Sequence, residues 1–138
     1  MQEVTKKIKW VNIFICFVLV ISCTHSINNP LQRGLVFKMP DKSFDIYSLE
    51  SSYIKAIENC KINKIKLVDS LYVIIAVGNH KVYYSNIFEP IVKEDQAIKK
   101  GTIIGRIDSI KNKFSNHLIL SIQDKKGNFI DDVNFKDE

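Results

Sequence analysis

The chain has 138 residues, of which 46% are hydrophobic and 25% charged, with 20 Lys+Arg against 15 Asp+Glu. These values are those of an ordinary single globular domain, and they argue against collagen-like, disordered and multi-span membrane proteins. Without residues 1–22, 17 Lys+Arg face 14 Asp+Glu, and so mild an excess does not argue for a nucleic-acid partner.

The first 22 residues have the pattern of a secretory signal peptide. Lys6, Lys7 and Lys9 give a positively charged start, and residues 11–21 form an apolar stretch with one polar interruption. A membrane-spanning helix needs about 20 apolar residues to cross a hydrocarbon core of about 30 Å. Because this run is shorter, cleavage after export is favoured over an uncleaved membrane helix.

The end of the apolar stretch carries a second signal. Residues 20–23, Val-Ile-Ser-Cys, resemble the bacterial lipobox, in which the cysteine is acylated and becomes the first residue of the mature protein. The resemblance implies a lipoprotein held in the membrane by acyl chains such as palmitate on Cys23. Because Thr24 is not an acidic retention residue, it also implies the periplasmic side of the outer membrane if the host is Gram-negative. The alternative is a cysteine that merely ends an apolar stretch.

We expect a tether over residues 23–33 and a folded domain over residues 34–138. Cys60 is the one cysteine of that expected domain, so an internal disulfide is excluded there. Its sequence neighbourhood holds no histidine and base arranged for catalysis. A small buried core residue is therefore favoured over a nucleophile.

From residue 35 onward, short β-branched runs alternate with turn residues. The expected strands cover residues 35–38, 52–57, 61–68, 71–77, 81–85, 103–108, 117–123 and 129–130. Residues 71–77 are apolar throughout, which predicts a place inside a sheet, and Gly78-Asn79 is a hairpin signal because both residues tolerate positive φ. No window keeps a helical period for ten residues. The pattern predicts an all-β antiparallel sandwich or barrel of about seven short strands.

Three segments, taken in order, resemble the lysostaphin-type (LytM-like) zinc endopeptidases. Residues 71–87 (LYVIIAVGNHKVYYSNI) resemble that family's hairpin with its Tyr-x-His-Leu motif, and residues 91–107 (IVKEDQAIKKGTIIGRI) resemble its two-glycine segment. Residues 116–135 (NHLILSIQDKKGNFIDDVNF) resemble its closing His-Leu-His strand, and residues 41–48 (DKSFDIYS) its opening His-x-Gly-x-Asp motif.

The resemblance implies a two-layer antiparallel fold with a duplicated hybrid motif, also described as a barrel-sandwich hybrid. It also implies a zinc site that cleaves peptide cross-bridges of peptidoglycan. Such a site uses three protein ligands and one metal-bound water, whose pKa the zinc lowers.

Carried over residue by residue, the zinc ligands are largely lost. Asp41 falls on the first ligand histidine, Asp45 retains the aspartate ligand, and Ile119 falls on the ligand histidine of the closing pair. An alkyl side chain cannot bind zinc. The resemblance therefore implies a pseudo-peptidase with no catalytic residue, no metal and no cofactor.

Three further positions of the former site carry over. Tyr84 retains the tyrosine of Tyr-x-His, Asn86 replaces its histidine, and His117 retains the other histidine of the closing pair. Simpler interpretations stay open. His117 is also explained as a strand residue whose ring is hydrogen-bonded in the core, and Asp45 as a turn acceptor. Tyr83 and Tyr84 point to opposite faces of a strand, so one is expected in the core.

Three functions are compatible with these features. The favoured one is an exported, non-catalytic lipoprotein whose peptidase-like domain binds peptidoglycan or a protein of the cell envelope, with regulation of cell-wall hydrolases as an implied role. The alternative is a divergent zinc endopeptidase using Asp41, Asp45 and His117. Residues 94–107 also resemble half of a biotinyl or lipoyl domain, but the lysine tripeptide that such carriers modify is missing from the expected mature chain.

Overall fold

The computed structural model describes residues 25–108 and 116–137, and all regular secondary structure in these ranges is β-strand. The predicted all-β class is confirmed. No helix in these ranges is long and apolar enough to cross a membrane. The expected signal peptide and Cys23 lie outside the described residues. The strands within the described ranges are β1 His25–Asn28, β2 Leu35–Lys38, β3 Phe44–Tyr47, β4 Tyr53–Lys55, β5 Cys60–Val68, β6 Leu71–Gly78, β7 Lys81–Ile87, β8 Glu89–Pro90, β9 Ala97–Ile98, β10 Ile103–Arg106, β11 His117–Gln123 and β12 Val133–Lys136.

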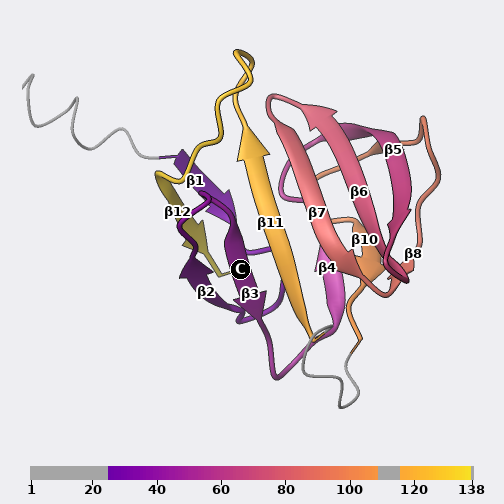
Figure 1. Ribbon diagram of the computed structural model, residues 1–138, viewed down its shortest axis with the longest axis horizontal. Helices are drawn as coiled ribbons and strands as arrows, with labels where there is room; N and C mark the ends of the chain where they lie inside the picture. Colours follow the sequence, from indigo (N-terminus) through magenta and orange to yellow (C-terminus); the bar gives the residue numbers. More distant parts are fainter. Residues whose placement is uncertain (1–24, 109–115, 138) are drawn as a thin grey trace, which may run out of the picture.

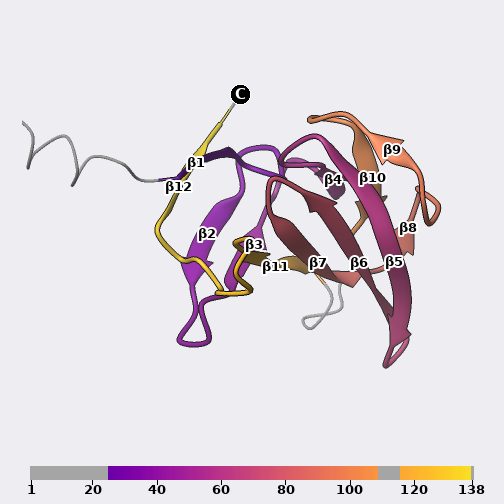
Figure 2. The ribbon, with the colours of Figure 1, turned by 90° about the horizontal axis from the view of Figure 1, so that it is seen from above.

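The described strands form three sheets. Seven of them make the large sheet in the order β2-β3-β11-β7-β6-β5-β9, three make the sheet β4-β10-β8, and β1 pairs with β12. The β1–β12 ladder is parallel, whereas the ladders of the other two sheets are antiparallel. The three-stranded sheet lies behind the β7-β6-β5 half of the large sheet, and the β1–β12 pair lies behind its β2-β3 half (Figures 1 and 2). The apolar strand β6 is interior, as predicted.

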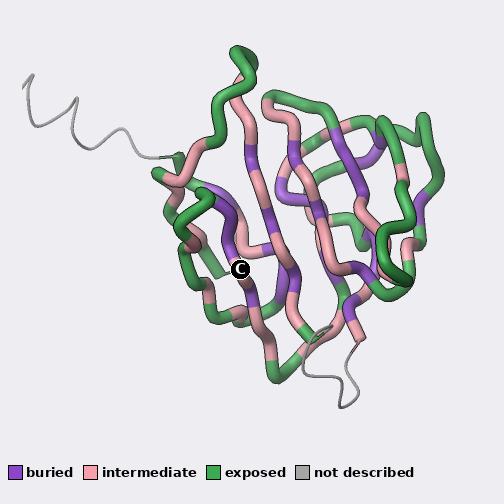
Figure 3. Tube along the Cα trace, in the orientation of Figure 1, coloured by how far each residue is buried: buried purple, intermediate pink, exposed green. Residues whose placement is uncertain are grey.

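The core fills the space between the large sheet and the two smaller ones. Along β11, Leu118, Leu120 and Ile122 are fully buried while the residues between them are half-buried, an alternation that Figure 3 shows along the whole strand. Burying each such side chain stabilises the fold by about 1.5–3 kcal/mol. The opposite, solvent side of the large sheet is called the outer face below; His117 and Ile119 lie on it.

The two hairpins β5–β6 and β6–β7 differ in the backbone conformation of their turn residues. The predicted hairpin joins β6 to β7, but neither Gly78 nor Asn79 has a positive φ. Gly78 is needed for a different reason, because a Cβ there would lie 2.2 Å from the Asn59 carbonyl oxygen. In the other hairpin, Asp69 and Ser70 join β5 to β6 and both have a positive φ, as the two central residues of a type I′ turn do.

The expected strands require several corrections. Residues 44–47 form β3 although the sequence pattern marks them only as a motif, and the two short strands β8 and β9 are likewise unpredicted. Residues 129–130 contribute a single bridge, between Gln123 and Phe129. A bulge between Ile62 and Lys64 shifts the alternation of β5, so that Ile62, Ile65 and Leu67 all lie on the core side; Leu67 is exposed because it lies beside the β5–β6 turn.

Cys60 is half-buried at the start of β5 rather than fully buried. Partial burial raises the pKa of its thiol, and the nearby Glu58 carboxylate raises it further. A raised pKa keeps the sulfur protonated, which fits a packing role better than a nucleophilic one.

The largest correction concerns the expected tether. Residues 25–28 form β1, and the chain then turns so that Leu31 is fully buried in the core. The Asn29 side chain holds this turn, because its Oδ1 accepts the Leu31 N–H at 3.1 Å and its Nδ2 donates to the Gly34 carbonyl at 2.8 Å. The folded domain therefore includes residues 25–33, and the boundary predicted at residue 34 is wrong.

Candidate functional site

Two rows of cross-strand neighbours bring three of the six former-site positions, Asp45, His117 and Ile119, together on the outer face. One row runs from Phe37 on β2 through Asp45 on β3 and Ile119 on β11 to Ser85 on β7. Directly paired residues of antiparallel strands point to the same side of a sheet, with Cβ atoms about 4.5–5.5 Å apart. The neighbouring row holds Leu35, Tyr47 and His117.

Asp45 and Ile119 are direct partners in this row. Asp45 lies within strand β3, so the interpretation of this residue as a turn acceptor is wrong. The half-buried carboxylate has the alkyl group of Ile119 on one side and the ring of Phe37 on the other. The position that would carry a second metal ligand is thus occupied by a side chain that binds only apolar groups.

Asp41 lies apart from these rows, in the turn between β2 and β3. Its carboxylate accepts the Ser43 N–H at 3.0 Å and the Ser43 hydroxyl. These hydrogen bonds lower the pKa of Asp41, because they stabilise the charged form. Lys42 in the same turn has a φ of 68°. Asp41 therefore has a local role in shaping the turn.

Tyr84 does not belong to the outer face. Its side chain is fully buried, and its hydroxyl accepts the backbone N–H of Ile57 at 3.1 Å. Burial raises the pKa of the phenol, which keeps the hydroxyl neutral. Tyr83 is the partner that faces outward, half-buried and hydrogen-bonded to Gln123 at 3.2 Å. The prediction that the two tyrosines occupy opposite faces is confirmed.

Asn86 joins β7 to the start of β11. It has a φ of 69°, and its Nδ2 donates to the His117 carbonyl oxygen at 2.7 Å. Asparagine adopts the left-handed region more readily than most residues. Asn86, which the sequence resemblance places at a histidine position, thus holds two strands in register here.

His117 stacks on Tyr47, with ring centroids 4.7 Å apart and an interplanar angle of 24°. Its Nδ1 is buried and has no hydrogen-bond partner among the described residues. The expectation of a histidine ring hydrogen-bonded in the core is therefore wrong for this nitrogen. The stack fixes the imidazole against the outer face, at the end of β11 nearest Asn86.

Tyr47 separates two hollows that sequence reasoning did not identify. On one side is a shallow apolar hollow of about 450 Å³ lined by Leu35, Phe37, Met39, Asp45 and Tyr47. Leu35 is 63% and Phe37 54% exposed, which is unusual for such large apolar side chains. Once residues 44–47 are known to form a strand, the alternation in Phe-Asp-Ile-Tyr identifies Asp45 and Tyr47 as outward-facing.

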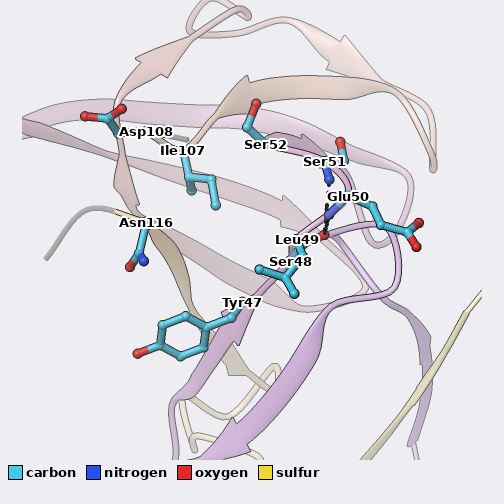
Figure 4. A pocket seen from close by; sticks show the side chains of 9 residues that line it. All are labelled: Tyr47, Ser48, Leu49, Glu50, Ser51, Ser52, Ile107, Asp108 and Asn116. Atoms are coloured by element: carbon cyan, nitrogen blue, oxygen red, sulfur yellow. Dashed lines mark hydrogen bonds between the residues drawn. The ribbon is translucent and has the colours of Figure 1, made fainter. Parts of the chain in front are cut away.

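The second hollow, of about 340 Å³, is polar (Figure 4). It is lined by Tyr47, Ser48, Leu49, Glu50, Ser51, Ser52, Ile107, Asp108 and Asn116. The Ser48 hydroxyl shapes one wall, because it donates to the Gln32 carbonyl at 2.6 Å and accepts the N–H groups of Glu50 and Ser51 at 3.2 Å. An apolar and a polar hollow that share one aromatic wall suit an extended, amphipathic ligand.

The residues present do not fit a zinc ion. Among the described residues, no group of three or more His, Cys, Asp or Glu side chains is arranged to hold a metal. Ile119 offers no donor atom, and the Asp41 carboxylate is engaged by Ser43. Of the former ligand positions only Asp45 keeps its ligand type, and a single carboxylate does not make a catalytic zinc site.

Replacing Asn86 tests its role in joining the strands. Asn86→Ala is expected to lower the free energy of unfolding by about 1–3 kcal/mol, because a left-handed backbone is strained for alanine and the bond to the His117 carbonyl is lost. Urea unfolding followed by circular dichroism measures this change. Asn86→Gly also loses the side chain but relieves the backbone strain, so it is expected to cost less than Asn86→Ala; an equal or larger loss for Asn86→Gly would contradict the assignment.

No family model matches the chain by sequence, and no curated protein matches it. Solved structures match by fold. Lysostaphin is 21% identical, with 75% of this chain and 49% of that chain covered and a TM-score of 0.58. A putative M23 peptidase from Pseudomonas aeruginosa is 15% identical, with 70% and 44% covered and a TM-score of 0.57. The complex of SpoIIIAH and SpoIIQ matches at 19% identity, with 79% and 90% covered and a TM-score of 0.54.

The chain therefore has the LytM-like fold of lysostaphin-type peptidases, as the sequence resemblance implied. It spans about half the length of the lysostaphin and Pseudomonas aeruginosa chains and most of the matched chain of the SpoIIIAH–SpoIIQ complex. The fold neighbours thus include both peptidases and a protein–protein complex.

Proposed function

We propose that this chain is an exported lipoprotein, acylated at Cys23, whose peptidase-like domain binds a protein of the cell envelope through its outer face and cleaves nothing. The observation that carries the proposal is the row in which Asp45 lies between Phe37 and Ile119, the residue that the sequence resemblance places at a zinc-ligand position. Asp45 is the one charged residue among those that line the adjoining apolar hollow. Such a surface gains free energy by being covered by a partner.

Two structures support a protein partner over other ligands. The SpoIIQ–SpoIIIAH pore-forming complex matches this chain at a TM-score of 0.52, and the second structure of the same two proteins at 0.54. Both contain two different proteins in one assembly. We infer that the fold can serve as a binding module, and that the apolar hollow beside Tyr47 is the contact surface here.

Site-specific photo-cross-linking in cells tests this proposal. A photoreactive residue at position 37 is expected to give one discrete protein adduct, identified by mass spectrometry, because Phe37 is exposed beside the hollow. Position 67 is the control, since Leu67 is also exposed but lies at the far end of β5. Adducts at both positions, or at neither, would contradict the proposed surface. Sedimentation with purified sacculi then shows whether peptidoglycan is bound instead.

Once the partner is identified, matched serine variants measure the contribution of the apolar hollow. Leu35→Ser combined with Phe37→Ser is expected to weaken binding at least about tenfold, since each buried apolar side chain contributes about 1.5–3 kcal/mol. Leu67→Ser is the control, because Leu67 is 64% exposed and Leu35 63%. Because all three side chains are exposed, these substitutions are expected to change the free energy of unfolding by no more than about 0.5 kcal/mol. Equal binding by the double variant and the control would exclude this hollow from the interface.

The alternative, a divergent zinc endopeptidase, is tested by metal analysis. Protein incubated with zinc and desalted is expected to retain no stoichiometric metal, because Ile119 and the engaged Asp41 leave too few donors. One zinc per chain that is lost in Asp45→Ala or His117→Ala would contradict the binding proposal. It would restore the peptidase hypothesis.

A further inference from the structure

Six lysines gather at one end of the large sheet. The last full row of cross-strand neighbours at this end runs from Gln123 through Lys81, Val77 and Lys61 to Ala97. It crosses the five strands β11, β7, β6, β5 and β9 without interruption. Lys81 and Lys61 therefore flank Val77 on the same side of the sheet.

The turns beyond this row add the other four lysines. The hairpin after β11, closed by the Asp124 N–H and the Asn128 carbonyl at 2.9 Å, carries Lys125 and Lys126. The turn after β9 is held to the start of β5, because the Lys100 N–H donates to the Asn59 side chain at 2.8 Å. The six residues of this basic end are Lys61, Lys81, Lys99, Lys100, Lys125 and Lys126.

The carboxylates near the basic end are mostly engaged. Glu58 contacts the His80 ring at 2.6 Å, and Asp124 accepts the N–H groups of Lys126 and Asn128 within its own turn. Asp95 lies 4.0 Å from Lys61, and Asp132 is exposed beside β1. Six lysines against these four carboxylates leave this end positive.

The part of the β5–β6 hairpin that lies away from the basic end differs from it in charge. Lys64 and Lys66 lie in the second half of β5, toward the turn that carries Asp69, and the Glu94 carboxylate accepts the Ile65 N–H at 3.0 Å. The two cations and the two anions balance there. The positive excess therefore belongs to one end of the sheet rather than to β5 as a whole.

The described chain begins at this same end. The rings of His25 and His80 meet edge to face with centroids 5.6 Å apart, and His80 lies in the β6–β7 turn next to Lys81. In Figure 1 the start of β1, the β6–β7 turn and the hairpin after β11 all lie along the upper side of the molecule. Cys23 precedes His25 by two residues, which span at most about 7 Å in any conformation.

We propose that the basic end lies directly on a membrane surface of anionic phospholipids; the inference rests on acylation of Cys23, which the proposed function includes. Anionic headgroups attract lysines near the bilayer. Phe129, which is 41% exposed, and Val77, which is 44% exposed, stand among these lysines and contact the interfacial region. The domain is then seated on the bilayer by its own surface and does not hang from a flexible tether.

This orientation places the His117 end of the outer face away from the lipid. Gln123 lies at the basic end of β11 and His117 at the other end, about 20 Å further on at about 3.4 Å per residue. Tyr47 and the polar hollow lie at the His117 end. A partner in the envelope therefore reaches Tyr47 and the polar hollow without competing with the membrane.

Lysine footprinting of the full chain tests the proposal. Protein purified from membranes is reconstituted in vesicles of phosphatidylcholine, with or without phosphatidylglycerol, and labelled briefly with an amine-reactive reagent. Labelling of Lys99, Lys100, Lys125 and Lys126 is expected to fall about threefold or more when phosphatidylglycerol is present, and to recover in high salt. Lys64 and Lys66 are expected to label equally in both vesicles.

Charge-reversed pairs provide the matched control. Lys125→Glu with Lys126→Glu is expected to abolish the protection of Lys99 and Lys100, whereas Lys64→Glu with Lys66→Glu is expected to leave it intact. Protection that is absent, equal at both ends, or given by peptidoglycan sacculi in place of anionic vesicles would overturn the proposal. The mass of the Cys23 peptide is read from the same spectra. Acylation without protection refutes only the seating on the membrane, and protection without acylation refutes only the lipoprotein.

Discussion

Leu31→Ala is expected to lower the free energy of unfolding by about 2–5 kcal/mol, the range for removing a fully buried leucine from a core. Leu31 has no exposed surface and belongs to the same apolar cluster as the strands of the large sheet. Its backbone is held in place as well, since its carbonyl accepts the Gly34 N–H at 3.1 Å. The change is measured by urea unfolding. The slope of the unfolding free energy against urea concentration is expected to stay the same, because a changed slope would indicate a changed unfolded or native state.

The matched control for this variant is Leu49→Ala. Leu49 is 102% exposed, so the same chemical change is expected to alter stability by less than about 0.5 kcal/mol. If Leu31→Ala were as harmless as Leu49→Ala, residues 25–33 would be a tether and the domain would begin near residue 34. That outcome would also remove the short connection between Cys23 and β1 on which the seating on the membrane depends.

The tether was predicted because its residues are polar, and the structure shows why polarity misleads here. Asn29 and Pro30 follow an apolar stretch, and that composition is typical of an exposed linker. Asn29 instead uses both ends of its amide inside one turn, and the Pro30 carbonyl accepts the Lys55 N–H at 2.8 Å. A polar residue that satisfies backbone groups within a turn looks the same in sequence as one that faces solvent.

The strands with strong local patterns were predictable. The bounds of β2 and β11 match the expected ranges, and β5, β6 and β7 differ by one or two residues. The pair β1–β12 was not predictable, because it joins residues 25–28 to residues 133–136 in parallel. The alternation of β12, Val-Asn-Phe-Lys, is only four residues long and β1 has a single apolar residue, so their pairing shows only when the rest of the fold has brought the two segments together.

The candidate site was predictable only in part, for a geometric reason. Pattern matching placed Tyr84, Asn86, His117 and Ile119 in one former site, but residues that share a motif do not all face the same side of a strand. Ile119 and His117 face outward together, whereas Tyr84 faces the core. The apolar hollow was missed because Leu35 and Phe37 are strand residues, and a single sequence does not reveal which side of an edge strand is left uncovered.

Tyr84→Phe is expected to lower the free energy of unfolding by about 1–3 kcal/mol while leaving partner affinity unchanged. The variant keeps the ring but removes the hydroxyl that accepts the Ile57 N–H at 3.1 Å. The buried N–H of Ile57 is then left without a partner, which costs about 1–3 kcal/mol. Tyr83→Phe is the control on the opposite face, where the lost bond to Gln123 is half-exposed and a smaller change is expected. Stability is read from urea unfolding and affinity from titration with the identified partner. A variant that kept full stability but lost partner binding would place Tyr84 in the binding surface, and the side of β7 that faces the partner would have to be reassigned.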